Sequence, residues 1–165
     1  MEQFEIERKF LIRMPDRTLL DKLSCSEIEQ VYILSPEGLR ERIRRRDYGD
    51  RIEYTHTAKR HISDIRRVEH EEEISAERYR ALLRSADPTR RTLEKKRYLY
   101  EYAGQCFEID VFPFWNSAAL MELELRSEEQ EIRFPPRIEI IREVTSEKAF
   151  TNSAIARRIP ELGIE

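Results

Sequence analysis

Polar and apolar residues alternate with a period of two in segment after segment of this 165-residue chain. Near the N-terminus, Glu5, Glu7 and Lys9 alternate with Ile6 and Phe10. Successive side chains of a β-strand point to opposite faces of a sheet, so the three ionisable residues share one face and the two apolar residues share the other. The pattern predicts strands with one charged face and one apolar face.

The same alternation returns along the rest of the chain, and the polar residues keep to one side of each predicted strand. After the N-terminal strand, this charged face holds Arg40, Arg42, Thr57, Lys59, Arg67, Glu69, Glu71, Lys95, Arg97, Glu108, Asp110, Glu122 and Glu124. Acids and most of the bases come in pairs two residues apart, which a loosely mixed solvated face does not require. The regularity favours a surface that binds a ligand both polyanionic and metal-coordinating.

Segments that break the two-residue period predict helices. Asp16 is a candidate N-cap for a helix near residues 17–24, and Ser75 for one near residues 76–86. A third helix is expected over residues 146–159, where apolar residues recur at helical spacing. We expect it to pack across the apolar face of the sheet, and it is also the element expected to plug or unplug one end of the sheet if the sheet closes into a tunnel.

Turn signals at residues 35–38, 48–50 and 103–105 predict hairpins and therefore antiparallel pairing. Roughly eight strands with few long crossovers favour a closed barrel over an open sheet, since closure removes the exposed edges. The expected fold class is α+β, an eight-stranded antiparallel barrel with helices packed outside on the apolar face. Its charged interior must be hydrated, because burying unpaired charge is costly, so the sequence predicts a water-filled tunnel.

Composition narrows the possible partners and the location. With 38% charged residues and a formal charge of −3, the chain has no basic excess for binding nucleic acid by bulk electrostatics, and we expect a small-molecule partner. The sequence contains no apolar run near 18 residues and no signal-peptide pattern, so we expect a cytoplasmic protein without membrane contact. The length predicts one domain over residues 1–165. Whether it forms a homodimer is left open.

The order of these charged pairs resembles the CYTH superfamily, the triphosphate tunnel metalloenzymes. The opening Glu5-Ile6-Glu7-Arg8-Lys9 matches the Glu-x-Glu-x-Lys signature of that family. Further matches follow in the same order along nearly the whole chain: Gln30-x-Tyr32, Arg40-x-Arg42, Thr57-x-Lys59, Arg67-x-Glu69-x-Glu71, Lys95-x-Arg97, Glu108-x-Asp110, Glu122-x-Glu124 and Glu143-Val144-Thr145.

The resemblance implies an eight-stranded tunnel that binds a linear triphosphate and hydrolyses it with Mg²⁺ or Mn²⁺. By analogy with the family, the principal metal ligands would be Glu5, Glu7, Glu122 and Glu124, with Glu71 and Asp110 as further acidic candidates. Paired carboxylates suit Mg²⁺, which is usually held by one or two carboxylates together with substrate phosphates. Some of these acids could instead serve only to pair with the basic residues.

A triphosphate also needs cations from the protein. Arginine forks match phosphate oxygens and lysine acts as a point charge, so the predicted phosphate-binding residues are Lys9, Arg40, Arg42, Lys59, Lys95 and Arg97. The attacking water would be activated either by a second metal or by a lysine of lowered pKa, for which Lys9 and Lys95 are the candidates. We interpret the run Arg44-Arg45-Arg46 as a solvated hairpin end.

Inorganic tripolyphosphate is the leading candidate substrate. A class IV adenylyl cyclase and a nucleoside or thiamine triphosphatase remain enzymatic alternatives, and thiamine would require an aromatic platform, for which Trp115 is the only tryptophan. A non-catalytic polyphosphate-binding module is the alternative of another class, and the intact acidic pairs at both ends of the chain argue against it.

Overall fold

The computed structural model describes residues 2–63 and 65–164. The described strands are β1 (Glu2–Arg13), β2 (Ser24–Ile33), β3 (Arg40–Asp47), β4 (Ile52–His61), β5 (Arg66–Glu73), β6 (Leu93–Tyr102), β7 (Gln105–Val111), β8 (Ala118–Glu124) and β9 (Ile140–Glu143). The helices are α1 (Arg17–Leu20), α2 (Ala76–Leu82) and α3 (Asn152–Arg157), with 3₁₀ turns at Leu83–Ser85 and Lys148–Phe150. None of these helices is long and apolar enough to cross a membrane.

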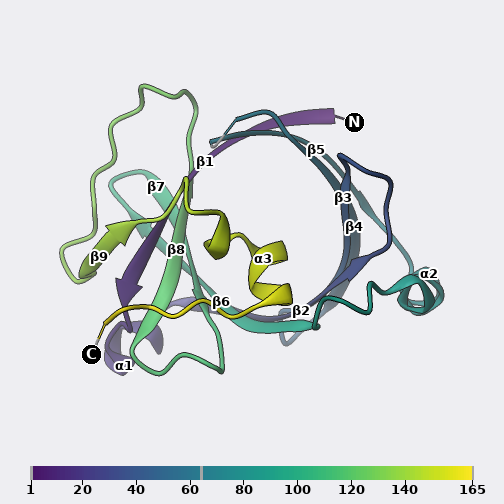
Figure 1. Ribbon diagram of the computed structural model, residues 1–165. Coiled ribbons are helices and arrows are strands. Elements are labelled where there is room, and N and C mark those ends of the chain that lie inside the picture. Colours follow the sequence, from purple (N-terminus) through teal and green to yellow (C-terminus); the bar gives the residue numbers. More distant parts are fainter. Residues whose placement is uncertain (1, 64, 165) are drawn as a thin grey trace.

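The strands form one antiparallel sheet that closes on itself. Their order is β5-β4-β3-β2-β6-β7-β8-β1-β9, and an additional pairing joins β5 to β1. Closure therefore uses the eight strands from β1 to β8, seen as a ring in Figure 1, and β9 is attached outside the ring to β1. The predicted fold class, an α+β eight-stranded antiparallel barrel, is confirmed.

The predicted hairpins are confirmed at all three turns. Gly49 lies between β3 and β4 with a φ of 93°, a backbone conformation that L-residues rarely adopt. Ala103 and Gly104 connect β6 to β7 with φ angles of 52° and 72°, the left-handed pair that a two-residue hairpin turn needs. These turns fix the register that sends the charged residues inward.

Helices α1 and α2 cover the outer face of the barrel, as predicted. Leu19 and Leu20 of α1 pack with outward-facing residues of β1, β6, β7 and β8, including the fully buried Phe107. Ser75 caps α2 by accepting a hydrogen bond from the backbone N–H of Arg78. On this face Tyr79 of α2 packs against β2 and β3.

The C-terminal segment differs from the prediction in its length and in the face on which it packs, although its place at one end of the barrel was expected. The expected helix over residues 146–159 is reduced to one 3₁₀ turn and the short α3, and it does not pack across the apolar outer face. Phe150 and Ile155 instead contact Leu11, Leu93 and Leu120, which share the face of the charged residues. In Figure 1, α3 accordingly lies within the outline of the ring, so this segment covers one end of the barrel.

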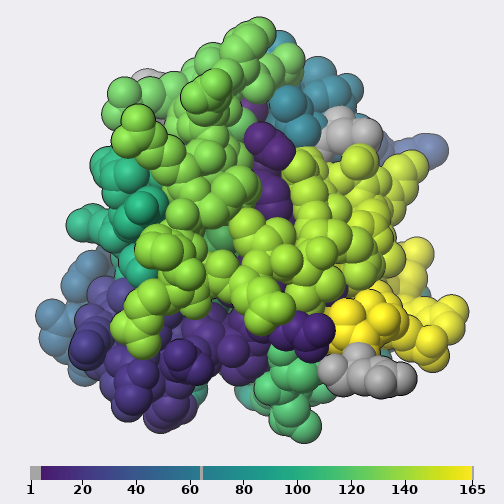
Figure 2. All heavy atoms as spheres, turned by 90° about the vertical axis from the view of Figure 1, so that its left-hand side faces the viewer, coloured from purple at the N-terminus to yellow at the C-terminus, as the bar shows by residue number. Residues whose placement is uncertain are grey.

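The segment between β8 and α3 also wraps around β1. Backbone hydrogen bonds pair β9 with the C-terminal half of β1, and Val144 donates to the carbonyl of Lys9. In Figure 2 only a narrow strip of β1 stays visible between the green and yellow-green atoms of this segment. The strand that carries the N-terminal motif is therefore held from both sides.

Candidate active site

One wall of the barrel interior carries the four glutamates that were predicted as principal metal ligands. Strands β1 and β8 pair antiparallel, with Glu7 opposite Glu124 and Lys9 opposite Glu122. Glu5 lies two residues before Glu7 on the same face of β1. Cross-strand partners point to the same side of a sheet, so the structure brings Glu5, Glu7, Glu122 and Glu124 together. We call these four residues the acidic wall.

Three of the four carboxyl groups of the acidic wall hold protons more tightly than an exposed glutamate does. Burial and the neighbouring Glu122 raise the pKa of Glu7 to about 8. Burial and a hydrogen bond with Glu69 raise the pKa of Glu5, and burial together with Glu7 raises the pKa of Glu124. Negative charge is therefore crowded here, and a proton or a cation must relieve it.

Glu122 behaves differently because it has a close cationic partner. Its carboxylate lies 3.0 Å from Nζ of Lys9, and both side chains are 11% exposed. Burial acts to raise the pKa of Glu122, but Lys9 and Arg97 outweigh it and lower that pKa to about 2. Glu122 is therefore ionised at neutral pH.

The two further acidic candidates lie with cations instead of joining the acidic wall. Asp110 accepts hydrogen bonds from Arg97 at 2.8 and 3.0 Å and lies 2.7 Å from Nζ of Lys95. These cations outweigh burial and hold the pKa of Asp110 far below its usual range. Glu71, on β5, accepts a hydrogen bond from Thr57 at 2.9 Å and lies 3.6 Å from Arg44. Both carboxylates are thus engaged in pairing.

The predicted phosphate-binding residues fall into two groups. Lys9, Lys95 and Arg97 are already paired with acids, and Arg97 contacts a further acid, Glu108, at 2.9 Å. Arg42 has a buried Nε that makes no hydrogen bond within the described residues. The side chain of Arg40 takes part in none of the hydrogen bonds or ion pairs found among the described residues, and Lys59 is held only loosely by Glu5 at 3.4 Å. The cations on β3 and β4 are therefore the ones open to an anion.

Arg44 is a site residue that the sequence interpretation missed. It was assigned with Arg45 and Arg46 to a solvated hairpin end, whereas its side chain is only 12% exposed. Its Nε is buried without a hydrogen-bond partner, and burial together with Arg42 and Arg97 lowers its pKa to about 10. The two-residue alternation could have identified Arg44, because it lies two residues after Arg42 and must therefore share the same face of the strand.

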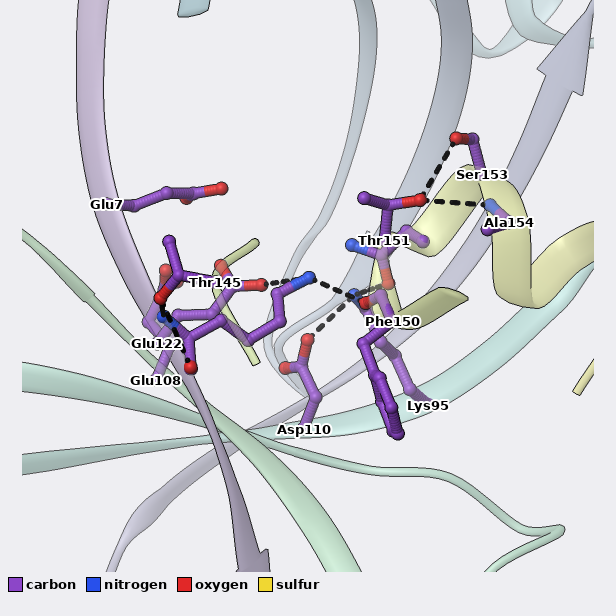
Figure 3. A network of polar contacts seen from close by, with 12 residues as sticks. Glu7, Lys95, Glu108, Asp110, Glu122, Thr145, Phe150, Thr151, Ser153 and Ala154 are labelled. Carbon is purple, nitrogen blue, oxygen red and sulfur yellow. Dashed lines mark hydrogen bonds and ion pairs between the residues drawn. The ribbon is translucent and has the colours of Figure 1, made fainter. Parts of the chain in front are cut away.

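The two lysines predicted as candidate general bases differ in the direction in which their pKa is shifted. Lys9 donates to the backbone carbonyl of Phe150 at 3.0 Å, and Glu122 and Glu7 raise its pKa against the effect of burial. Lys95 is fully buried beside Asp110 and donates to the side chain of Asn152 at 3.3 Å. Burial lowers the pKa of Lys95 to about 8 despite Asp110. Figure 3 shows Asp110, Lys95 and Phe150 meeting where the C-terminal segment enters the barrel.

A cavity of about 1300 Å³ opens from the surface into the barrel interior. Its inner lining includes Glu7, Lys9, Arg42 and Lys59, and its outer lining comes from the β2–β3 loop and from residues 145–161. Ligand pockets are typically about 300–1000 Å³, so this one is large. A small anion can therefore reach both the acidic wall and the cations of β3.

The acidic wall fits a divalent metal held jointly with a substrate. Among residues 2–63 and 65–164, no three His, Cys, Asp or Glu side chains converge into a ready-made metal centre. Mg²⁺ and Mn²⁺ do not need one, since such ions commonly take one or two carboxylates and complete their coordination with water and phosphate oxygens. The raised pKa values of Glu5, Glu7 and Glu124 are those of carboxyl groups that a cation would deprotonate.

The closed barrel, its charged interior and the order of its charged pairs indicate the CYTH class that the sequence resembles, and comparison with known families gives the same result. The family model described as the CYTH domain matches residues 3–157. The chain therefore belongs to the CYTH domain family.

The chain is also similar to individual proteins of known name or structure. The chain is 34% identical over 159 residues to an inorganic triphosphatase of Nitrosomonas europaea, covering 94% of this chain and 99% of the relative. A crystal structure of an inorganic triphosphatase superimposes with a TM-score of 0.60 at 32% identity, covering 95% of this chain and 97% of that one. A protein from Pyrococcus horikoshii shares the fold at 19% identity, with a TM-score of 0.55 over 75% of this chain and 80% of its own.

Proposed function

We propose that this chain is a metal-dependent triphosphatase that hydrolyses inorganic tripolyphosphate to pyrophosphate and phosphate inside the barrel. One observation carries the proposal: Glu7 of the crowded acidic wall lines the same cavity as Arg40, Arg42 and Lys59, of which Lys59 alone has an acidic partner, at 3.4 Å, among the ion pairs of the described residues. Such an arrangement suits a ligand that brings both a divalent metal and several negative charges. The relative from Nitrosomonas europaea, named an inorganic triphosphatase and covered almost entirely by this chain, supports it.

In this proposal Glu5, Glu7, Glu122 and Glu124 hold Mg²⁺ or Mn²⁺. When bound, the metal supplies positive charge to the phosphate oxygens and lowers the pKa of a coordinated water. The protein keeps the carboxylate oxygens together on two paired strands, so that the carboxyl groups lose their protons when the cation binds. Glu71 and Asp110 orient the neighbouring cations, to which the structure already pairs them.

The cations would position the phosphates. Arg40, Arg42 and Lys59 are open to the substrate, and Arg44 extends the same row along β3. Guanidinium groups bind phosphate oxygens through two parallel hydrogen bonds, which fixes orientation as well as charge. Phosphoryl transfer is catalysed mainly by such positioning and by neutralising the charge that develops on the leaving oxygen.

A proton must leave the attacking water. Of the two candidate bases, Lys95 fits better, because burial lowers its pKa to about 8 and so brings the neutral amine within reach at physiological pH. Lys9, whose pKa is raised, is better suited to hold charge next to Glu122. We propose Lys95 for proton transfer on the strength of its pKa, although its side chain is fully buried beside Asp110 and does not line the cavity, and Lys9, which lines the cavity, for phosphate binding.

The surroundings favour an inorganic substrate over thiamine triphosphate. Trp115 is 7% exposed and packs edge-on against Phe112 and Phe114, so its face is not offered to a ligand. The aromatic residues that line the cavity, Tyr32 and Phe150, are 4% and 2% exposed. An organic group at the mouth would therefore find little aromatic surface on which to stack.

The test is phosphate release from tripolyphosphate, ATP and thiamine triphosphate, each with Mg²⁺, Mn²⁺ or EDTA. We expect metal-dependent turnover of tripolyphosphate that EDTA abolishes and that Glu122→Gln reduces by at least about a hundredfold, as for loss of a preorganised charged group. Glu94→Gln, an exposed glutamate on β6, is the matched control. Binding without turnover under every metal would contradict the proposal, and pyrophosphate with cyclic AMP from ATP would replace it with the cyclase.

A further inference from the structure

Three arginines from distant parts of the sequence meet at the outer lining of the cavity. Arg40 begins β3, Arg90 lies in the loop before β6, and Arg157 ends α3. Their proximity is reflected in the electrostatics, since burial, Arg90 and Arg157 together lower the pKa of Arg40. We call these three residues the rim cluster. Like charges placed together cost free energy unless an anion joins them.

Two members of the rim cluster are held in place by neighbouring groups. Arg90 lies 2.7 Å from Asp87, donates to the backbone carbonyl of Ser153 at 3.2 Å, and is stacked 5.9 Å from the ring of Tyr32. Arg157 donates to the hydroxyl of Thr89 at 3.5 Å. Binding of an anion would therefore cost less side-chain entropy than binding to freely mobile arginines.

The third member, Arg40, is open. It is exposed, and its side chain makes no hydrogen bond or ion pair within the part of the chain that the structure describes. Among the described residues, Asp87 is the one carboxylate that forms an ion pair with a member of the rim cluster. The positive charge of the rim cluster is therefore not balanced. Arg40 is also two residues before Arg42 on the same face, which links the rim cluster to the inner site at roughly 7 Å of strand.

The lining of the cavity carries an excess of positive charge. Ten Lys or Arg side chains and five Asp or Glu side chains line it. The excess of cations continues outward past Arg42, where the organic part of a nucleotide would have to lie. A site built for a nucleoside triphosphate does not need guanidinium groups at that point.

We propose that the rim cluster is a phosphate subsite that binds the next phosphate of a linear polyphosphate whose inner three phosphates occupy the tunnel. The inference rests on the proposed function, because it takes the inner phosphates to be bound at Arg42 and Lys59. It deepens that function by naming the substrate class: inorganic polyphosphate chains of four or more phosphates bind more tightly than tripolyphosphate.

The test compares chain lengths by two measurements on the full-length protein. The first is the affinity of the metal-free protein, in EDTA, for tripolyphosphate and tetrapolyphosphate by titration calorimetry. The second is the ratio of kcat/KM for the two chains with Mg²⁺. We expect tetrapolyphosphate to bind about threefold to fivefold more tightly, the size of effect that a partly exposed ion pair gives.

The diagnostic variant is Arg157→Gln, at an exposed position where folding is not at risk. It should remove the preference for the longer chain and leave the affinity for tripolyphosphate nearly unchanged. Arg80→Gln, which removes the same charge from the exposed side of α2, should keep the preference.

Equal affinity for both chains, or a preference that survives in Arg157→Gln, would overturn the subsite. Orthophosphate binding that Arg157→Gln abolishes without changing the chain-length preference would overturn it too, because the rim cluster would then hold a separate anion. Absence of tripolyphosphate turnover would refute the proposed function alone, since calorimetry in EDTA reports on the rim cluster without catalysis.

Discussion

Replacing Glu7 by glutamine should stabilise the metal-free protein at high pH. The folded-state pKa of Glu7 is about 8, against an ordinary value of 4.5, because burial and Glu122 disfavour its charged form. A carboxyl group with a raised folded-state pKa costs nothing below pH 4.5, where both states are protonated. Its cost grows as pH rises to about 8 and then stays constant.

The magnitude follows from that difference. At about 1.4 kcal/mol per pH unit, ionised Glu7 would destabilise the fold by about 5 kcal/mol above pH 8. Local relaxation and water penetration lessen the cost of a buried charge, so we expect about 2–4 kcal/mol in practice. Glutamine keeps the shape of the side chain and removes the charge.

The assay is urea denaturation of wild type and Glu7→Gln in EDTA between pH 5 and 9. The free energies of unfolding should agree near pH 5 and diverge in favour of the variant as pH rises. Adding Mg²⁺ should stabilise wild type more than the variant. A constant difference across the pH range, or a variant that is less stable at pH 9, would refute the crowding of the acidic wall.

Three further predictions test other parts of the site and the fold. Arg44→Gln should raise the KM for tripolyphosphate about tenfold, as loss of a charge-assisted hydrogen bond does, while Arg45→Gln on the outer face changes it by less than about twofold. Ile155→Ala should lower the free energy of unfolding by about 2–5 kcal/mol in urea denaturation, because this side chain of α3 is fully buried in the apolar cluster between α3 and the barrel strands. Asp110→Asn should destabilise by about 3–5 kcal/mol, since Lys95 and Arg97 lose their buried partner, and an unchanged melting temperature would contradict this pairing.

The barrel could be predicted from the sequence because its determinants are local. The period of two decides which side chains share a face, and glycines at positive φ, such as Gly49, mark the turns. Closure followed from the need to protect strand edges. The same parity rule placed Glu5, Glu7, Glu122 and Glu124 on the charged face, and the resemblance to the CYTH superfamily singled them out as metal ligands.

What the sequence did not reveal depends on contacts between distant segments. The apolar spacing of residues 146–159 is satisfied equally by the outer face of the sheet or by an apolar patch inside one end of the barrel, and only tertiary packing decides between them. Arg44 was misassigned because a run of arginines resembles a solvated turn, although its parity indicated otherwise. The pairing of Asp110 with Lys95 and Arg97 depends on the geometry of β6 and β7, which residue types alone do not give.

The pairing of β1 with both β8 and β9 has a consequence for how the protein folds. The first strand of the barrel finds partners more than a hundred residues further along the chain, at Ala118–Glu124 and Ile140–Glu143. Such long-range pairings carry a large entropic cost of loop closure and make folding slow. During synthesis, the N-terminal half of β1 can pair with β5 early, but its C-terminal half remains unpaired until nearly the whole chain has emerged, and the acidic wall forms only when the barrel closes.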